Sequence, residues 1–249
     1  MWQILIKKNT VIFLLVSLLV ALIVGNRGDT RDTIAYYSVF KYIDVFNLLN
    51  PIQFYAFTGM EIGFGWYCYL ISLISNSHII LFTIFSFLTF YVIFLVSEKI
   101  NIKIIPVLLL YLSSGYFLLQ QFTQIRQGFS TPLALYALAV FISKDNKFSI
   151  KLLLITLLAF SFHQVALPIV IIGVFFSVIL KKIPLSINKF KWSAVIIFIL
   201  FIVVAKFILG DILINISSRV EEYSSSAEYA QDLGIFRLPN IKAFFTFLV

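Results

Sequence analysis

The sequence predicts an all-α, polytopic helical membrane protein with about seven or eight crossings and two interfacial helices after the first span. Of its 249 residues, 61% are hydrophobic and only 12% are charged, and its mean hydropathy is +1.02. Soluble domains carry roughly 25% charged residues. The composition therefore excludes a soluble enzyme, a disordered chain and a nucleic-acid binder.

Apolar runs long enough for spans recur along the whole chain, so we expect one integral-membrane domain over residues 1–249. The expected spans are Val11–Val24, His78–Val96, Ile104–Leu119, Gly128–Ile142, Phe148–Phe162, Gln164–Leu180 and Trp192–Leu209. A final stretch, Ile241–Val249, reaches only about 13 Å as a helix. We therefore expect a truncated C-terminus.

The lysines between the spans determine the predicted topology, because lysine-rich loops stay on the cytoplasmic side. They form four clusters, at residues 7–8, 99–103, 144–151 and 181–191. All four share one side only if the short, glycine-interrupted run Ile62–Ile74 does not cross. We interpret that run as an interfacial or re-entrant helix and Ile34–Leu49 as a second surface-lying helix. The N-terminus is then cytoplasmic, and segments 26–76 and 210–240 lie at the outer face.

This topology places every arginine of the chain on the outer face, where acidic residues outnumber basic ones. Arginine offers a planar, bidentate fork for phosphate or carboxylate, whereas lysine acts as a point charge. Chance and longer outer loops also explain such a distribution. The pattern nevertheless favours an anionic ligand at the outer face.

Two outer segments carry most of the candidate residues. In the first, Arg27, Asp29, Arg31 and Asp32 place four charges within six residues. This is either a solvated turn or a site at membrane depth, where ionisable groups are costly and usually functional. In the second, Gln120–Gln127, Arg126 either extends to the bilayer surface or faces a lipid diphosphate.

Two further residues fit more than one role. His163 joins two spans and is either a hydrogen-bonded structural residue, a proton acceptor or a donor to phosphate. Glu61 precedes an apolar helix, where the helix dipole favours a carboxylate. It is a candidate base only if it faces the same cavity as Asp29.

Other chemistries find no support in the sequence. The single cysteine, Cys68, excludes an internal disulfide framework and a multi-thiolate metal site. Phosphate-binding loops, dinucleotide fingerprints and zinc-binding motifs are missing from the sequence. We expect no cofactor and no metal site.

Four short motifs, in order, resemble the EpsG family of Wzy-like O-antigen and exopolysaccharide polymerases. They are Gly28-Asp29 with Tyr36-Tyr37, Glu61-Ile62-Gly63-Phe64, Ile125-Arg126-Gln127 and Phe162-His163. The resemblance covers roughly Val24 to Leu180 and implies a GT-C-like membrane glycosyltransferase in the bacterial inner membrane, within lipopolysaccharide or exopolysaccharide synthesis. The implied partners are an undecaprenyl-diphosphate-linked glycan, the lipid bilayer and a chain-length regulator protein.

The resemblance also implies roles for the candidate residues. A base must take a proton from the acceptor hydroxyl, and cations must stabilise the leaving diphosphate. Asp29 is the leading base, followed by Asp32, Glu61 and His163, although His163 also suits phosphate binding. Arg126 is the first choice for the diphosphate, with Arg31, Arg27 and Gln127 assisting.

Three other functions compete with a polymerase. A GT-C transferase that uses a polyprenyl-phosphate sugar donor needs the same base and the same phosphate-binding cations. A flippase for lipid-linked glycans needs ionisable groups deep within its spans, and the middle of nearly every predicted span lacks them. A non-enzymatic scaffold for the polysaccharide complex would tolerate loss of Arg126 and Asp29.

Overall fold

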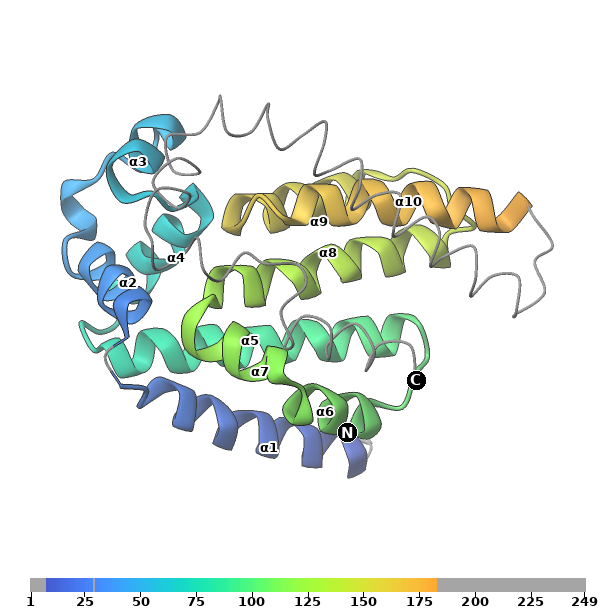
Figure 1. Ribbon diagram of the computed structural model, residues 1–249, viewed down its shortest axis with the longest axis horizontal. Helices are drawn as coiled ribbons and strands as arrows, with labels where there is room; N and C mark the ends of the chain where they lie inside the picture. The colour runs from blue at the N-terminus through green and yellow to red at the C-terminus, as the bar shows by residue number, and fades with distance from the viewer. Residues whose placement is uncertain (1–7, 29, 183–249) are drawn as a thin grey trace, which may run out of the picture. The chain divides into compact units, whose positions relative to one another are not determined.

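The computed structural model describes residues 8–28 and 30–182, all within the compact unit Met1–Ile183. Every regular element of these residues is helical (Figure 1), as the all-α prediction requires. The predicted loop 210–240, the runs Trp192–Leu209 and Ile241–Val249 and the candidate Asp29 lie outside the described residues.

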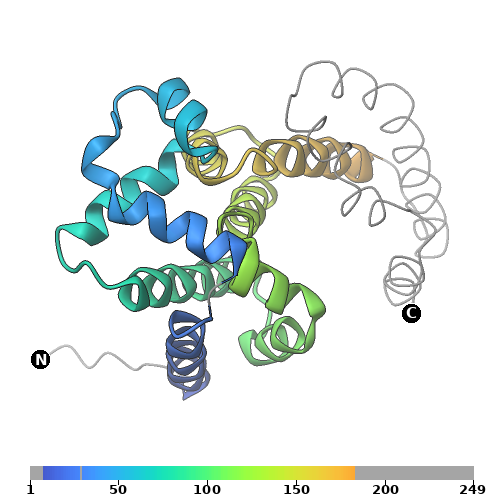
Figure 2. The ribbon, with the colours of Figure 1, turned by 60° about the vertical axis from the view of Figure 1, so that its left-hand side comes forward.

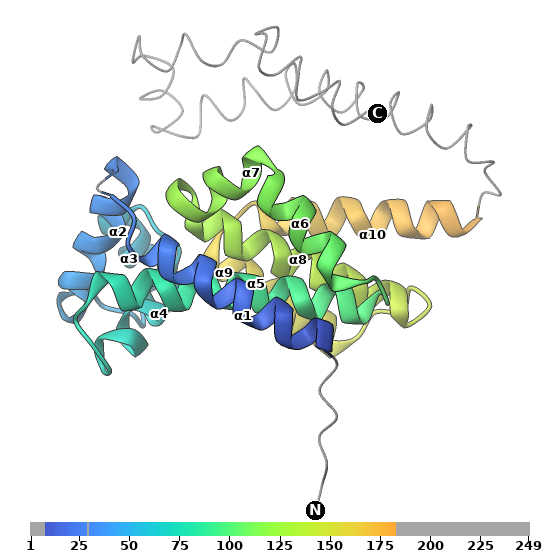
Figure 3. The same cartoon turned by 90° about the horizontal axis from the view of Figure 1, so that it is seen from below.

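Six helices run side by side as a bundle. Their bounds are α1 (Lys8–Gly25), α5 (His78–Lys99), α6 (Ile104–Ser113), α8 (Ile125–Ser143), α9 (Ile150–Phe162) and α10 (Ala166–Lys182). Helix α8 packs against α5, α9 and α10, and α1 packs along α5 and α6 (Figures 1 and 3). The fully buried Ala134 and Ala137 of α8 allow this close approach, since small side chains let helix backbones come together.

Three described helices are long and apolar enough to cross a membrane, namely α1, α5 and α8. A fourth candidate is the bent pair formed by Ile104–Ser113 and Gly115–Thr123, while α9 and α10 are shorter apolar helices. Successive bundle helices run in opposite directions (Figure 1). The helix ends that carry lysines therefore meet at one end of the bundle: Lys8 begins α1, Lys99 ends α5, Lys103 precedes α6, Lys144 follows α8 and Lys151 lies in the first turn of α9.

At the other end of the bundle, residues 31–72 form a cap of short helices. These are α2 (Arg31–Lys41), the 3₁₀ turn η1 (Ile43–Val45), α3 (Pro51–Thr58) and α4 (Ile62–Ser72). In Figure 2, α2 runs across the view, whereas α1, α8 and α9 are seen nearly end-on. With 11 residues, α4 is too short to cross a bilayer that needs about 20. Its placement as an interfacial or re-entrant helix stays a prediction.

The cap also corrects the predicted helix boundaries. We expected one helix over Ile34–Leu49, but α2 begins at Arg31, because the Thr30 hydroxyl accepts from the Thr33 N–H at 3.2 Å, and ends at Lys41. Helix α3 was not predicted. It begins where the Asn50 side chain accepts from the Gln53 N–H, with Pro51 in the first turn, and it ends at Gly59 in the left-handed conformation.

The expected span Ile104–Leu119 is not one continuous helix, because the chain bends by 77° between Ile104–Ser113 and Gly115–Thr123. Ser114 is extended, and its hydroxyl accepts from the Phe117 N–H, so a new short helix, α7 (Gly115–Leu118), begins there. A π-helical turn, η2 (Leu119–Thr123), follows and leads directly into α8. Such turns recur at functional sites. This one lies just before α8, so that Arg126, at the start of α8, lies beside the cap.

Candidate active site

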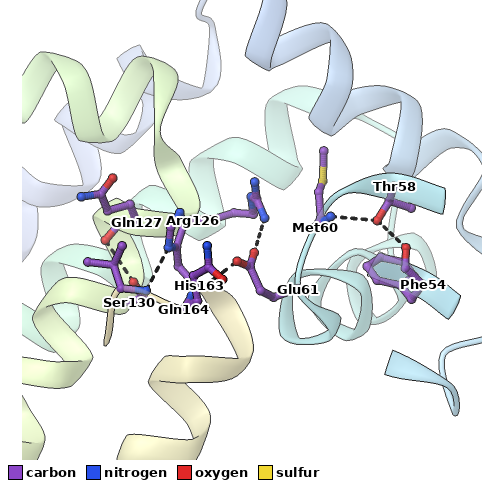
Figure 4. Close-up of polar contacts among 10 residues, drawn as sticks. Phe54, Thr58, Met60, Glu61, Arg126, Gln127, Ser130, His163 and Gln164 are labelled. Atoms are coloured by element: carbon purple, nitrogen blue, oxygen red, sulfur yellow. Dashed lines mark hydrogen bonds and ion pairs between the residues drawn. The ribbon is translucent and has the colours of Figure 1, made fainter. Parts of the chain in front are cut away.

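The centre of the candidate site is an ion pair between Glu61 and Arg126. Glu61 occupies the N-cap position of α4, and Arg126 is the second residue of α8. One guanidinium NH1 group of Arg126 donates to the Glu61 carboxylate, and each side chain is only 14% exposed (Figure 4). The two residues lie 65 positions apart in the sequence, so the tertiary fold creates this pair.

The turn between α9 and α10 completes the cluster. The backbone N–H of Gln164 donates to the second carboxylate oxygen of Glu61 at 3.4 Å. The backbone N–H of Val165 donates to Nδ1 of His163 at 3.2 Å. Because Nδ1 accepts this bond, a neutral His163 carries its proton on Nε2. The free side of the imidazole is therefore a hydrogen-bond donor.

Burial sets the protonation state of His163. Desolvation lowers the pKa of the half-buried imidazole below its ordinary value of 6.5. The nearby Glu61 carboxylate opposes this change, and the Arg126 guanidinium reinforces it. The lowered pKa favours the neutral imidazole, and the Val165 contact favours the tautomer with its proton on Nε2.

A close helix contact holds Glu61 beside this turn. A Cβ atom at Gly63 would lie 2.6 Å from the backbone carbonyl oxygen of Ser161, which is closer than real Cβ atoms come. Gly63 therefore allows the first turn of α4 to touch the last turn of α9. Glu61 and His163 each lie two residues from this contact.

Tyr36 of α2 lies against the other side of Arg126. The guanidinium carbon is 5.6 Å from the centre of the Tyr36 ring, within reach of a cation–π interaction. Burial raises the pKa of the Tyr36 hydroxyl, and Arg126 opposes this rise. The negative charge of Asp32, one helical turn earlier in α2, adds to this rise in the pKa of Tyr36.

A cluster of four phenylalanines lies beneath these polar groups. Phe64, Phe129 and Phe162 come within three residues of Glu61, Arg126 and His163 respectively, and all three contact Phe85 of α5, with ring centroids 5.1–5.9 Å apart. Each of the four side chains is at most 8% exposed. The cluster fixes the ends of α4, α8 and α9 relative to one another.

Arg27 lies deeper and joins two parts of the fold. Its Nε donates to the Val24 carbonyl at 3.0 Å, its NH1 donates to the Phe122 carbonyl at 3.4 Å, and its guanidinium lies 3.9 Å from the centre of the Phe82 ring. Burial lowers its pKa to about 10. These contacts attach the end of α1 to η2, so the segments that carry Arg27 and Arg126 meet at one end of the bundle.

The structure thus unites part of the predicted set. It brings Glu61, Arg126 and His163 together, and Asp32 lies one helical turn before Tyr36 in α2. Arg31 opens α2, and the amide of Gln127 points away from Glu61 (Figure 4). The roles of all these residues stay predictions.

Sequence reasoning missed two contributions, the Tyr36 ring and the backbone N–H of Gln164. Tyr36 belongs to a quoted motif, but only the fold shows that it lies against Arg126. Among residues 8–28 and 30–182, His, Cys, Asp and Glu side chains do not gather into a group that would hold a metal.

One nitrogen of the central arginine has no protein partner. Within the part of the chain that the structure describes, the buried Nε of Arg126 forms no hydrogen bond. A guanidinium presents five N–H donors in a rigid fork. Glu61 therefore holds one side of Arg126 and leaves donor capacity for an anionic group.

Comparison with known proteins identifies the family. The sequence profile of the EpsG family matches residues 10–249, nearly the whole chain. Neither curated proteins nor solved structures give a match. The family match extends well beyond the four motifs and includes residues outside the described part. The chain is therefore a member of the EpsG family.

Proposed function

We propose that this protein is a membrane glycosyltransferase that polymerises undecaprenyl-diphosphate-linked repeat units into O-antigen or exopolysaccharide at the outer face of the bacterial inner membrane. Family membership supports a polysaccharide polymerase-like role. The observation that carries the chemistry is the Glu61–Arg126 pair beside His163, at the bundle end opposite the lysine-bearing helix ends.

In the proposed reaction, an acceptor hydroxyl of one repeat unit attacks the anomeric carbon of another. A new C–O bond forms, the bond from that carbon to the diphosphate oxygen breaks, and the electron pair stays on the diphosphate. A protein base takes the hydroxyl proton. Cationic and N–H donors stabilise the charge that develops on the leaving group.

Arg126 is the main donor to the diphosphate in this proposal, and Nε2 of His163 is a second donor. Glu61 positions the guanidinium, because its two carboxylate oxygens are engaged by Arg126 and by the Gln164 N–H. Both oxygens of this carboxylate therefore already have partners within the protein. Proton acceptance then falls to Asp29, with Asp32 as the next candidate.

The test is complementation of a strain that lacks the gene, with polymer ladder length as the readout at equal protein levels. Arg126→Ala and Asp29→Asn should each abolish long polymer. Arg126→Lys should stay impaired, because a lysine cannot replace the bidentate fork. Lys41→Ala, which removes an exposed cation of the same cap, is the matched control and should retain wild-type ladders.

Two results would contradict this proposal. Wild-type ladders from both Arg126→Ala and Asp29→Asn would exclude these residues from the reaction. An incomplete repeat unit in the Arg126→Ala strain would indicate a transferase that adds single sugars, because loss of a polymerase leaves one complete unit.

A further inference from the structure

The cap contains a pocket along α4, lined mostly by apolar and aromatic side chains. It has a volume of about 260 Å³ and lies between the segment that follows α2 and the exposed face of α4. The lining residues are Ile43, Asp44, Phe46, Leu48, Trp66 and Tyr69. None of them takes part in the ion-pair cluster.

Three of the six lining side chains are aromatic. The Trp66 and Tyr69 rings meet edge to face, with centroids 5.9 Å apart and planes at 89°. Phe46 packs edge to face on Phe54 at 5.7 Å. Trp66 is 41% exposed, so much of its indole surface is open to a ligand.

The base of the pocket depends on a close approach of α4 to α3 and to the loop before α3. A Cβ atom at Gly65 would lie 2.7 Å from the Phe54 ring and 2.9 Å from a Leu48 methyl group. Ile43, only 2% exposed, closes the back of the space. The pocket is therefore a built feature of the cap.

Its chemistry matches that of a sugar ring. The apolar C–H face of a sugar packs on an aromatic face, which carries partial negative charge, and sugar hydroxyls donate to carboxylates in charge-assisted hydrogen bonds. Asp44 is exposed at the pocket and supplies such a carboxylate. A few polar groups in a mostly apolar lining are typical of ligand sites.

The position of the pocket relates it to the ion-pair cluster. Trp66 and Tyr69 lie five and eight residues after Glu61 along α4, or about 8 and 12 Å along the helix axis. We infer that this aromatic pocket binds a sugar ring of the repeat-unit glycan, away from the sugar bonded to the diphosphate. The inference rests on the proposed function, since it assigns a glycan subsite to the same substrate.

The test is a binding titration of the purified full-length protein. The probe is the repeat-unit oligosaccharide released by mild acid from the lipid-linked intermediates of the producing strain. The chain has three tryptophans, so Trp2→Phe and Trp192→Phe leave Trp66 as the only indole reporter. The oligosaccharide should change the Trp66 fluorescence saturably, and sorbitol, a polyol without a ring, should not.

Two variants separate sugar recognition from membrane anchoring. In the same background, Asp44→Ala should weaken the apparent affinity about tenfold, as expected for loss of a hydrogen bond to a charged group. Phe57→Ala, which removes a 72% exposed aromatic of the same cap, should bind normally. Absence of a saturable change, or equal affinity in Asp44→Ala, would overturn the inference and leave Trp66 as an interfacial anchor.

The titration is independent of polymerisation, because the released oligosaccharide lacks the diphosphate leaving group that glycosyl transfer requires. Saturable binding together with normal ladders from Arg126→Ala would refute the proposed reaction and retain the pocket. Missing binding together with lost ladders would refute the pocket and retain the reaction.

Discussion

Glu61 and Arg126 form an ion pair at the point where α4 and α8 both begin, with each side chain only 14% exposed. A helix N-terminus carries partial positive charge, which favours a carboxylate and disfavours a guanidinium. Glu61 therefore stabilises both its own helix start and the cation at the start of α8. The pair holds a positive group where an anionic ligand can reach it.

The first prediction concerns the energetics of this pair. Glu61→Ala or Arg126→Ala alone leaves a poorly solvated charge, so each change should lower the free energy of unfolding by up to about 3 kcal/mol. The double variant should lose clearly less than the sum of the two. Denaturant unfolding of the protein in detergent measures all three values. Additive losses would show that the two charges do not interact.

The second prediction concerns the helix contact at Gly63. Gly63→Ala places a methyl group against the Ser161 backbone and should cost about 1–3 kcal/mol of stability. It should also shorten polymer ladders, because Glu61 moves away from the His163 turn. Gly115→Ala is the control, since a Cβ atom there meets nothing within 4 Å. Equal effects of both changes would contradict the role of this contact.

The third prediction is a pH dependence from His163. Burial lowers its folded-state pKa below 6.5, with Glu61 and Arg126 as the charged groups that face it. Between the folded-state pKa and the ordinary pKa of about 6.5, which applies to the unfolded chain, the unfolded chain binds more protons than the folded protein. The free energy of unfolding therefore falls as pH drops below about 6.5, and it levels off below the folded-state pKa. Thermal unfolding between about pH 8 and pH 5 measures this slope.

His163→Asn removes the titrating group and keeps a hydrogen-bonding side chain. The variant should show a flatter pH dependence of stability over the same range. An unchanged slope would assign the titration to other groups.

The fourth prediction separates the two arginines. Arg27→Ala removes two hydrogen bonds to carbonyl groups and the contact with Phe82, and should lower stability by about 2 kcal/mol. Its ladders should fall only in proportion to the amount of folded protein. Full stability with no polymer would instead identify Arg27 as a ligand of the diphosphate.

Local signals explain most of the predicted fold and also its errors. Asn50, Pro51 and Gly59 are ordinary start and stop signals for α3. The predicted helices of the cap rest on hydropathy, however, and hydropathy does not detect helices as short as α3. The break at Ser114 lies within one apolar run, so periodicity could not reveal it. The 77° bend depends on how η2 packs against α8 and how α7 packs against η2.

The sequence by itself determined the helical membrane character, the shared end of the lysine-bearing loops and the candidate residues, because these follow from composition, hydropathy and charge order. Only the tertiary structure decided that Glu61 holds Arg126, that the His163 turn joins them and that Arg27 faces inward. Such pairings depend on close contacts between distant helices, such as that of Gly63 with Ser161. Spacing along the chain does not encode them.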